Sequence, residues 1–265
     1  MQLEQAVAAA SALTTLITVP ATLLAAHWTR RGADRAAAAT VLAGIDQSQA
    51  AVAAAHLQDL AGREQSREDA RRSAYAEFLS AADVLVRTVA ELPDVPDAAR
   101  RELLDQKATA VVQARAGVAV LGPPAVLSQA ENLAKQCAQL EKLALRRAVL
   151  RSAISALEDA WCPRNAEWCQ DLHHISAYVA WELLAEWGRL EDEVRWEKLD
   201  LLEANLRQSN ALEAAQVRQV LEVANSVAHW DEMIGGWLRD PLMERFQAVR
   251  DDFVDVAHAS LSLVA

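Results

Sequence analysis

Glycine, proline and cysteine are scarce in this chain. Of its 265 residues only 8 are glycine and 7 are proline, and β-branched runs bounded by turn residues are absent. Sustained helical periodicity with so few breakers predicts an all-α protein. The sequence also lacks a glycine-rich phosphate loop, a nucleophile elbow and a Walker or kinase signature. We therefore expect no enzymatic activity and no cofactor.

The three cysteines and the acidic charge balance narrow the function further. Three cysteines form a sparse, odd set, which is typical of a reducing compartment rather than of a disulfide framework. The net charge is −11, whereas nucleic-acid binding normally requires a basic face. The basic stretch Arg63–Arg72 is interleaved with Glu64, Glu68 and Asp69, as on a salt-bridged helix. We expect no nucleic-acid partner.

Charge is missing altogether from the segment Ala6–Ala26. A helix needs about 20 mostly apolar residues to cross a bilayer, so this segment predicts a transmembrane anchor over residues 1–29. No lysine or arginine precedes it, which argues against a cleaved signal peptide. The many alanines and threonines and the interruption at Pro20 leave a buried helix of a soluble protein as the alternative.

The residues that flank this segment predict its orientation. Arg30, Arg31 and Arg35 follow the span, whereas Glu4 precedes it. The positive-inside rule then places the N-terminus outside and the C-terminal domain in the cytoplasm of a single-pass protein of the cell membrane. Trp28 lies where an interfacial aromatic residue would anchor the helix end, and the arginines would contact lipid headgroups.

Residues 30–69 are expected to form a helical stalk next to the membrane. Near a 3,4 spacing this stretch carries Leu42, Ile45, Gln49, Val52 and His56. Such a seam is compatible with self-association into a homo-oligomer. The other interpretation, which we favour slightly, is an alanine-rich stalk that packs on its own chain.

Residues 70–265 are expected to form one cytoplasmic antiparallel bundle of long helices joined by short turns. Breaks are predicted at Pro93–Asp97, at Gly122-Pro123-Pro124 and at Trp161-Cys162-Pro163. Helices are expected over Ala98–Val120, from a capping box at Ser128 to Trp161, unbroken from Asn165 to Gln208, from Asn210 to Gly235, and from Asp240-Pro241 onward.

Tryptophan is unusually abundant. The chain has eight, against three phenylalanines and two tyrosines, and seven of the eight follow residue 160. Tryptophan supplies bulk to a core, which is the interpretation we favour, but it is also enriched at binding hot spots. The candidate partner-binding residues are Trp187, Trp196, Trp230 and Trp237.

Two sets of residues carry side chains that can bind a metal ion. Cys162, Cys169 and His173, with His174 beside them, provide zinc-type donors, but their spacing is not that of paired structural zinc ligands. Three other pairs, Asp171-x-x-His174, His229-x-x-Glu232 and Asp255-x-x-His258, differ from the Glu-x-x-His motif of di-iron bundles. We expect ordinary packing and no bound metal, with Cys162, Cys169 and His173 as a weak candidate.

Four stretches of the chain carry a resemblance to known proteins: His27–Arg35 after the apolar N-terminus, Arg71–Leu79, Leu121-Gly122-Pro123 and Arg250–Val254. They are similar to a loose group of membrane-anchored helical proteins of high-GC actinobacteria, some of which are labelled KilB-type plasmid-transfer proteins. Residues 155–240 depart from that pattern. The group has no established active site, so the resemblance implies location and architecture only.

These observations predict a non-enzymatic, membrane-tethered helical scaffold that acts through protein–protein contacts, including contacts with itself. The alternative is a membrane-active effector, in plasmid transfer or phage defence, that oligomerises and perturbs the bilayer. The small residues of the span, which permit close helix contact in lipid, favour this alternative.

Overall fold

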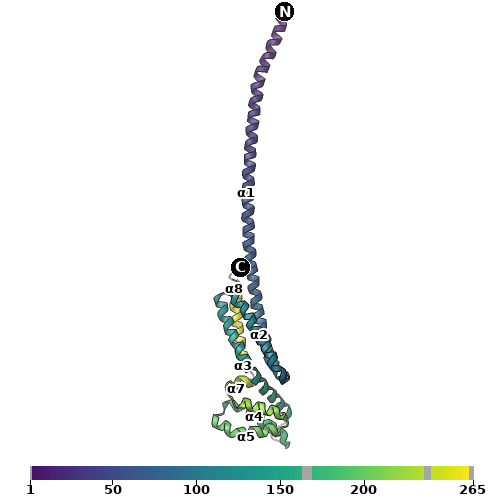
Figure 1. Ribbon diagram of the computed structural model, residues 1–265, viewed down its shortest axis with the longest axis vertical. Coiled ribbons are helices and arrows are strands. Elements are labelled where there is room, and N and C mark those ends of the chain that lie inside the picture. The colour runs from purple at the N-terminus through teal and green to yellow at the C-terminus, as the bar shows by residue number, and fades with distance from the viewer. Residues whose placement is uncertain (1, 163–168, 236–239, 263–265) are drawn as a thin grey trace. The chain divides into compact units, whose positions relative to one another are not determined.

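Helices dominate the chain, as the sequence predicts (Figure 1). The computed structural model describes the backbone of residues 2–162, 169–235 and 240–262, and the side chains of these ranges from residue 28 onward. No strand occurs in this part of the chain. In order, its elements are α1 (Gln2–Glu91), η1 (Leu92–Asp94), α2 (Asp97–Leu121), α3 (Pro124–Ala160), α4 (Leu172–Glu186), η3 (Trp187–Arg189), α5 (Asp192–Gln208), α6 (Ala214–Ala224), α7 (Trp230–Ile234) and α8 (Pro241–Ser262).

The chain divides into two units. The first unit is Met1–Ser66 and the second unit is Arg67–Ala265. Helix α1 supplies all of the described structure of the first unit and also the first helix of the second. The sequence places the end of the stalk at residue 69, close to this division.

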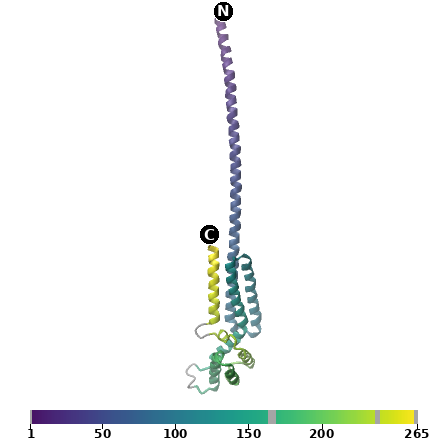
Figure 2. The same ribbon diagram turned by 90° about the vertical axis from the view of Figure 1, so that its left-hand side faces the viewer.

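In the second unit, residues 67–91 of α1 lie beside α2, α3 and α8 (Figure 2). The ring of Phe253 on α8 meets Tyr75 and Phe78 on α1 edge-on, at centroid distances of 6.1 and 5.4 Å. Arg250 on α8 also donates to the Asp83 carboxylate at 2.7 and 3.0 Å. Aromatic packing and this ion pair together join two helices that are far apart in sequence.

Helix α3 is the central element, because it packs against α2, α4, α6, α7 and α8. Its buried leucines, including Leu133, Leu140, Leu150 and Leu157, belong to one continuous hydrophobic core. The shorter helices α4 to α7 gather at one end of the second unit (Figure 1). A single core therefore holds the whole second unit together.

Some helix boundaries agree with the sequence and others do not. Helix α2 ends at Leu121, before Gly122-Pro123. Asp240 accepts hydrogen bonds from the backbone N–H groups of Leu242 and Met243, so it caps α8 as predicted. The prediction that Ser128 opens α3 is wrong, because the helix begins at Pro124, whose ring suits the first helical position.

The expected unbroken helix to Gln208 is also wrong. The chain turns at Trp187–Arg189, and α5 starts afresh at Asp192. Gly188 lies so close to Trp230 that a Cβ at Gly188 would be 2.6 Å from the Trp230 Cβ. This contact with α7 fixes the turn. The expected cap Asn165 lies outside the described residues.

The helix expected from Asn210 to Gly235 is two helices. Asn210 lies before α6 with φ of 54°, and the capping box is formed by Glu213 and Gln216. Helix α6 ends at Ala224, and His229, with φ of 65°, lies just before α7. Asparagine and histidine tolerate this left-handed conformation better than most residues, which explains how the chain turns here.

Among the residues whose side chains are described, no helical segment has both the length and the hydrophobicity that a membrane span requires. The predicted span Ala6–Ala26 lies outside those residues.

Candidate functional site

An exposed helix with large apolar side chains is the main feature of the first unit. Every residue from 28 to 66 is exposed. Seven large hydrophobic side chains in this stretch are between 48% and 68% exposed: Trp28, Val41, Leu42, Ile45, Val52, Leu57 and Leu60. Soluble proteins seldom leave so many large apolar side chains in water on one element, and such patches mark interaction sites.

Five of these side chains share one side of the helix. At 3.6 residues per turn, Val41, Leu42, Ile45, Val52 and Leu60 fall within an arc of about 100°, and we call this set the apolar face. Gln49 and His56 fall in the same arc, and Asp59 falls at its edge, at the angle of Val41. The apolar face thus extends the seam that the sequence predicts by adding Val41 before it and Leu60 after it. Leu57 and Trp28 lie outside the arc.

The surroundings of the apolar face are polar. Asp59 and Arg63 form an exposed ion pair of 2.8 Å across one helical turn. Toward the N-terminus, Arg30, Arg31 and Arg35 are all exposed. An exposed arginine cluster next to Trp28 has the composition expected at a lipid headgroup surface.

The four candidate partner-binding tryptophans lie in different environments. Trp187 is 1% exposed and donates from Nε1 to the Ala224 carbonyl oxygen at 2.9 Å. Trp230 is 2% exposed and donates to the Leu184 carbonyl oxygen at 3.0 Å. Both are core residues whose rings are closed to a partner. Trp196 is 70% exposed, and Trp237 lies outside the described residues.

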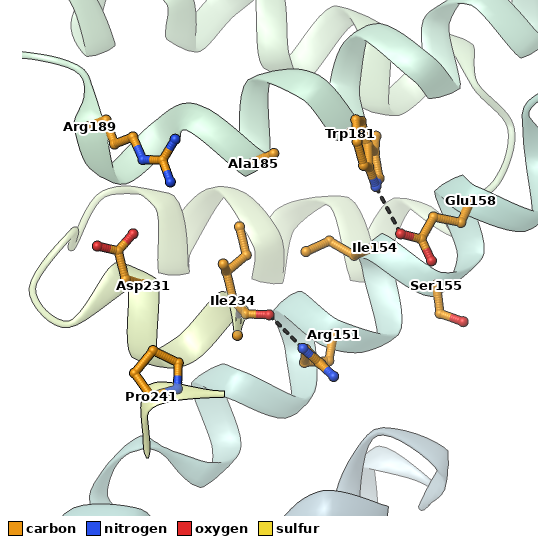
Figure 3. Close-up of a pocket in the computed structure, with 11 residues that line it drawn as sticks. Arg151, Ile154, Ser155, Glu158, Trp181, Ala185, Arg189, Asp231, Ile234 and Pro241 are labelled. Atoms are coloured by element: carbon orange, nitrogen blue, oxygen red, sulfur yellow. Dashed lines mark hydrogen bonds between the residues drawn. The ribbon is translucent and has the colours of Figure 1, made fainter. Parts of the chain in front are cut away.

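A cavity of about 560 Å³ opens between α3, α4, η3 and α7 (Figure 3). Trp181 Nε1 donates to Glu158 Oε1 at 3.0 Å, and Arg151 donates to the Ile234 carbonyl oxygen at 2.7 Å. Arg189 and Asp231 extend into the same space from η3 and α7. Among the described residues that line this cavity none is histidine or cysteine, and only Ser155 carries a hydroxyl. This described lining therefore does not pair a nucleophile with a histidine base.

A buried ion pair lies next to this cavity. The guanidinium of Arg147 is paired with the Asp240 carboxylate, and it also donates to the Glu232 carbonyl oxygen at 2.6 Å. Burial raises the pKa of the Glu232 carboxyl, but Arg245, Gln139 and His229 together lower the pKa overall through hydrogen bonds and charge. These contacts tie α3, α7 and α8 together, so the charged groups here serve the fold.

A third cluster joins the end of α3 to the start of α4. The donor atoms of Cys162, Cys169 and His174 all lie within 4.8 Å of one another. The structure groups His174 with the two cysteines, in place of the His173 of the candidate drawn from the sequence. His173 lies elsewhere: its Nδ1 is 2.6 Å from the Gln208 carbonyl oxygen and 3.1 Å from the Asn210 amide nitrogen. This contact with the end of α5 turns the His173 ring away from the cysteines.

Comparison with protein-family models, curated proteins and solved structures finds no match for this chain. The resemblance to actinobacterial membrane-anchored proteins stays a prediction.

Sequence reasoning missed the residues of the cavity and its aromatic neighbours. The ring of Tyr178 stacks on Trp161 at a centroid distance of 5.1 Å and on Trp181 at 6.0 Å. The rings of Trp161 and Trp181 are 4.7 Å apart and tilted by 50° to each other. They come from the end of α3 and from α4. The i,i+3 spacing of Tyr178 and Trp181 is a usable signal, but nothing local to either residue points to Trp161.

Proposed function

We propose that this protein is a non-enzymatic, membrane-tethered helical scaffold that self-associates in parallel through the apolar face of its first unit. The observation that carries this proposal is the helix over residues 28–66, in which every residue is exposed and five large apolar side chains share one side.

Burial of the apolar face supports a second copy of the chain as the partner. Fully burying a valine, leucine or isoleucine side chain is worth about 1.5–3 kcal/mol. The first unit contains no second helix that could cover this face. A second copy would present the same face, from Val41 to Leu60, over roughly 30 Å of helix. Five buried side chains from each copy then favour association over a free helix.

Gln49 and His56 bear on the geometry of that association. Both lie within the arc of the apolar face, where polar residues in a helical pair fix register and oligomeric state at some loss of stability. The alanines around this face, including Ala38 and Ala53, permit close approach of two helices. These features favour a defined pair over indiscriminate aggregation.

The proposed membrane tether is the uncharged segment Ala6–Ala26. Exposure of Arg30, Arg31 and Arg35 supports contact with anionic headgroups on the cytoplasmic side. Two copies anchored in one membrane have their first helices pointing the same way, which is why we propose a parallel arrangement. The second unit would then be held in the cytoplasm as the part that meets other proteins.

Membrane fractionation tests the tether. Full-length protein and a variant lacking residues 1–31 are expressed, and the isolated membranes are washed at alkaline pH. The full-length chain is expected to resist the wash, and the shortened chain is expected to be soluble. Recovery of both forms in the soluble fraction would contradict the proposal, because the first helix would then belong to a soluble assembly.

Induced expression separates the scaffold from a membrane-active effector. A scaffold is expected to leave growth and membrane potential unchanged. Loss of membrane potential that depends on residues 1–31 would contradict the scaffold and favour an effector that perturbs the bilayer.

A further inference from the structure

Three zinc-type donors converge where α3 ends and α4 begins. Cys162 lies two residues after the end of α3, Cys169 lies three residues before α4, and His174 is in the first turn of α4. Both cysteines are free thiols and only partly buried. An ion could therefore reach them from solvent.

The spacing of the donors fits zinc. Zinc binds sulfur at about 2.3 Å and imidazole nitrogen at about 2.0–2.1 Å in tetrahedral geometry. Two such ligands on one ion lie roughly 3.5 Å apart. The Sγ of Cys169 and the Nδ1 of His174 are 3.5 Å apart, and the Cys162 sulfur completes a cluster within 4.8 Å.

The other ring nitrogen of His174 faces a carboxylate. Asp171 Oδ2 is 3.9 Å from His174 Nε2, while Asp171 Oδ1 accepts a hydrogen bond of 2.8 Å from the His173 backbone N–H. A carboxylate at the distal nitrogen of a metal-binding histidine orients the ring and raises its basicity.

We propose that Cys162, Cys169 and His174 bind one zinc ion, which fastens the C-terminal end of α3 to the N-terminal end of α4. Binding converts the two thiols to thiolates and releases their two protons to solvent, with no change of oxidation state. The fourth coordination position is filled by water. Asp171 is a positioning residue that acts through His174.

The third cysteine and the adjacent histidine are excluded as ligands by where they lie. Cys137 is 23 residues before the end of α3, which is roughly 35 Å along the helix, and burial raises the pKa of its thiol to about 12. His173 Nδ1 is held against the Gln208 carbonyl oxygen. Cys137 and His173 therefore provide matched controls for Cys169 and His174.

Metal analysis and Co²⁺ spectroscopy of the full-length chain test this site. Protein purified in detergent under reducing conditions with added zinc is expected to hold one zinc per chain after desalting. Co²⁺ in place of zinc is expected to give the intense visible absorption of a tetrahedral ion and a thiolate charge-transfer band in the near ultraviolet. Absence of both metals from reduced, folded protein would overturn the proposal.

Variants assign the ligands. C162S, C169S and H174Q are expected to lose the charge-transfer band or the bound metal, whereas H173Q and C137S are expected to keep both. D171N is expected to weaken zinc binding about 10- to 100-fold. Far-ultraviolet circular dichroism of each metal-free variant shows that the helices persist. Loss of metal in H173Q with retention in H174Q would overturn the assignment.

A disulfide is the competing state of these cysteines. Mass spectrometry of protein alkylated directly in the cell lysate is expected to find Cys162 and Cys169 as thiols. A Cys162–Cys169 disulfide at this stage would overturn the proposal, because zinc requires both thiolates. These results are independent of the membrane and self-association tests, which do not involve the end of α3.

Discussion

The two units of this chain use helices in opposite ways. In the first unit, residues 28–66 form a helix with every side chain exposed. In the second unit, each long helix has one side in a common core, where Phe78, Leu140 and Phe253 have no exposed surface. Packing specifies the second unit, whereas local propensity specifies the helix of the first, which is rich in alanine.

This difference separates folding from assembly. The second unit already buries its apolar side chains within one chain, so its stability should depend on core substitutions. The first unit leaves its apolar face uncovered, so substitutions there should alter association and have little effect on the second unit. Fluorescence distinguishes the two, because all tryptophans except Trp28 belong to the second unit.

The largest expected effect is on the core. Phe78→Ala removes a fully buried ring that meets Phe253 at 5.4 Å, so the free energy of unfolding should fall by about 3–5 kcal/mol. Urea unfolding followed by tryptophan fluorescence measures this change. Val52→Ala in the first unit should leave the same transition unchanged. Equal effects of the two substitutions would remove the distinction between the units.

Breaking an ion pair should also destabilise the second unit more than the first. Arg147→Met leaves the Asp240 carboxylate and the Glu232 carbonyl oxygen without the Arg147 guanidinium, whose side chain is 5% exposed. Unfolding free energy should fall by about 3 kcal/mol. Arg63→Met breaks the exposed pair with Asp59 and should change stability by less than about 0.5 kcal/mol. Thermal unfolding of both variants gives the contrast, and similar shifts in the two would refute it.

Replacing a glycine by alanine should lower the stability of the second unit and raise that of the first. At Gly188 a new Cβ would lie 2.6 Å from the Trp230 Cβ, so Gly188→Ala should cost about 1–3 kcal/mol. Urea unfolding followed by fluorescence measures this loss, and near-ultraviolet circular dichroism should report a displaced Trp230. An unchanged spectrum and midpoint would show that the turn does not depend on this contact.

The smallest expected effect is a gain in helix stability. Gly44 has no atom within 4 Å of a new Cβ and lies within α1, so Gly44→Ala should stabilise the helix by about 0.5–1 kcal/mol. Thermal melting followed by far-ultraviolet circular dichroism should detect a later loss of helix in the first unit. A loss of helix content would mean that Gly44 makes a close contact with another chain.

A helix boundary can be predicted from the sequence when the residues that cause it are neighbours in the chain. The Asp240-Pro241 start and the Gly122-Pro123 turn each depend on neighbouring residues, and both are confirmed. The turn at Trp187–Arg189 was missed because apolar periodicity continues through it. The contact that requires this turn involves Trp230, which is 42 residues beyond Gly188. Gly188 and the acidic residues at the start of α5 are the signals in the sequence that indicate a break here.

The candidate metal ligands also show that the sequence alone cannot choose between neighbouring residues. Adjacent histidines on a helix point about 100° apart, so the sequence narrows the choice to His173 or His174 but does not make it. What decides is the contact between His173 and the Gln208 carbonyl oxygen, which depends on how α4 and α5 pack. Local pattern identifies the donors, and tertiary packing selects among them.

The molar mass of the full-length chain in detergent tests self-association through the apolar face most directly. Sedimentation equilibrium should give a dimer or larger oligomer for the wild type and for A54D, whose position is on the opposite side of the helix from Val52. V52D should reduce the mass to that of one chain, because a buried carboxylate opposes pairing. An identical mass for all three proteins would contradict the account.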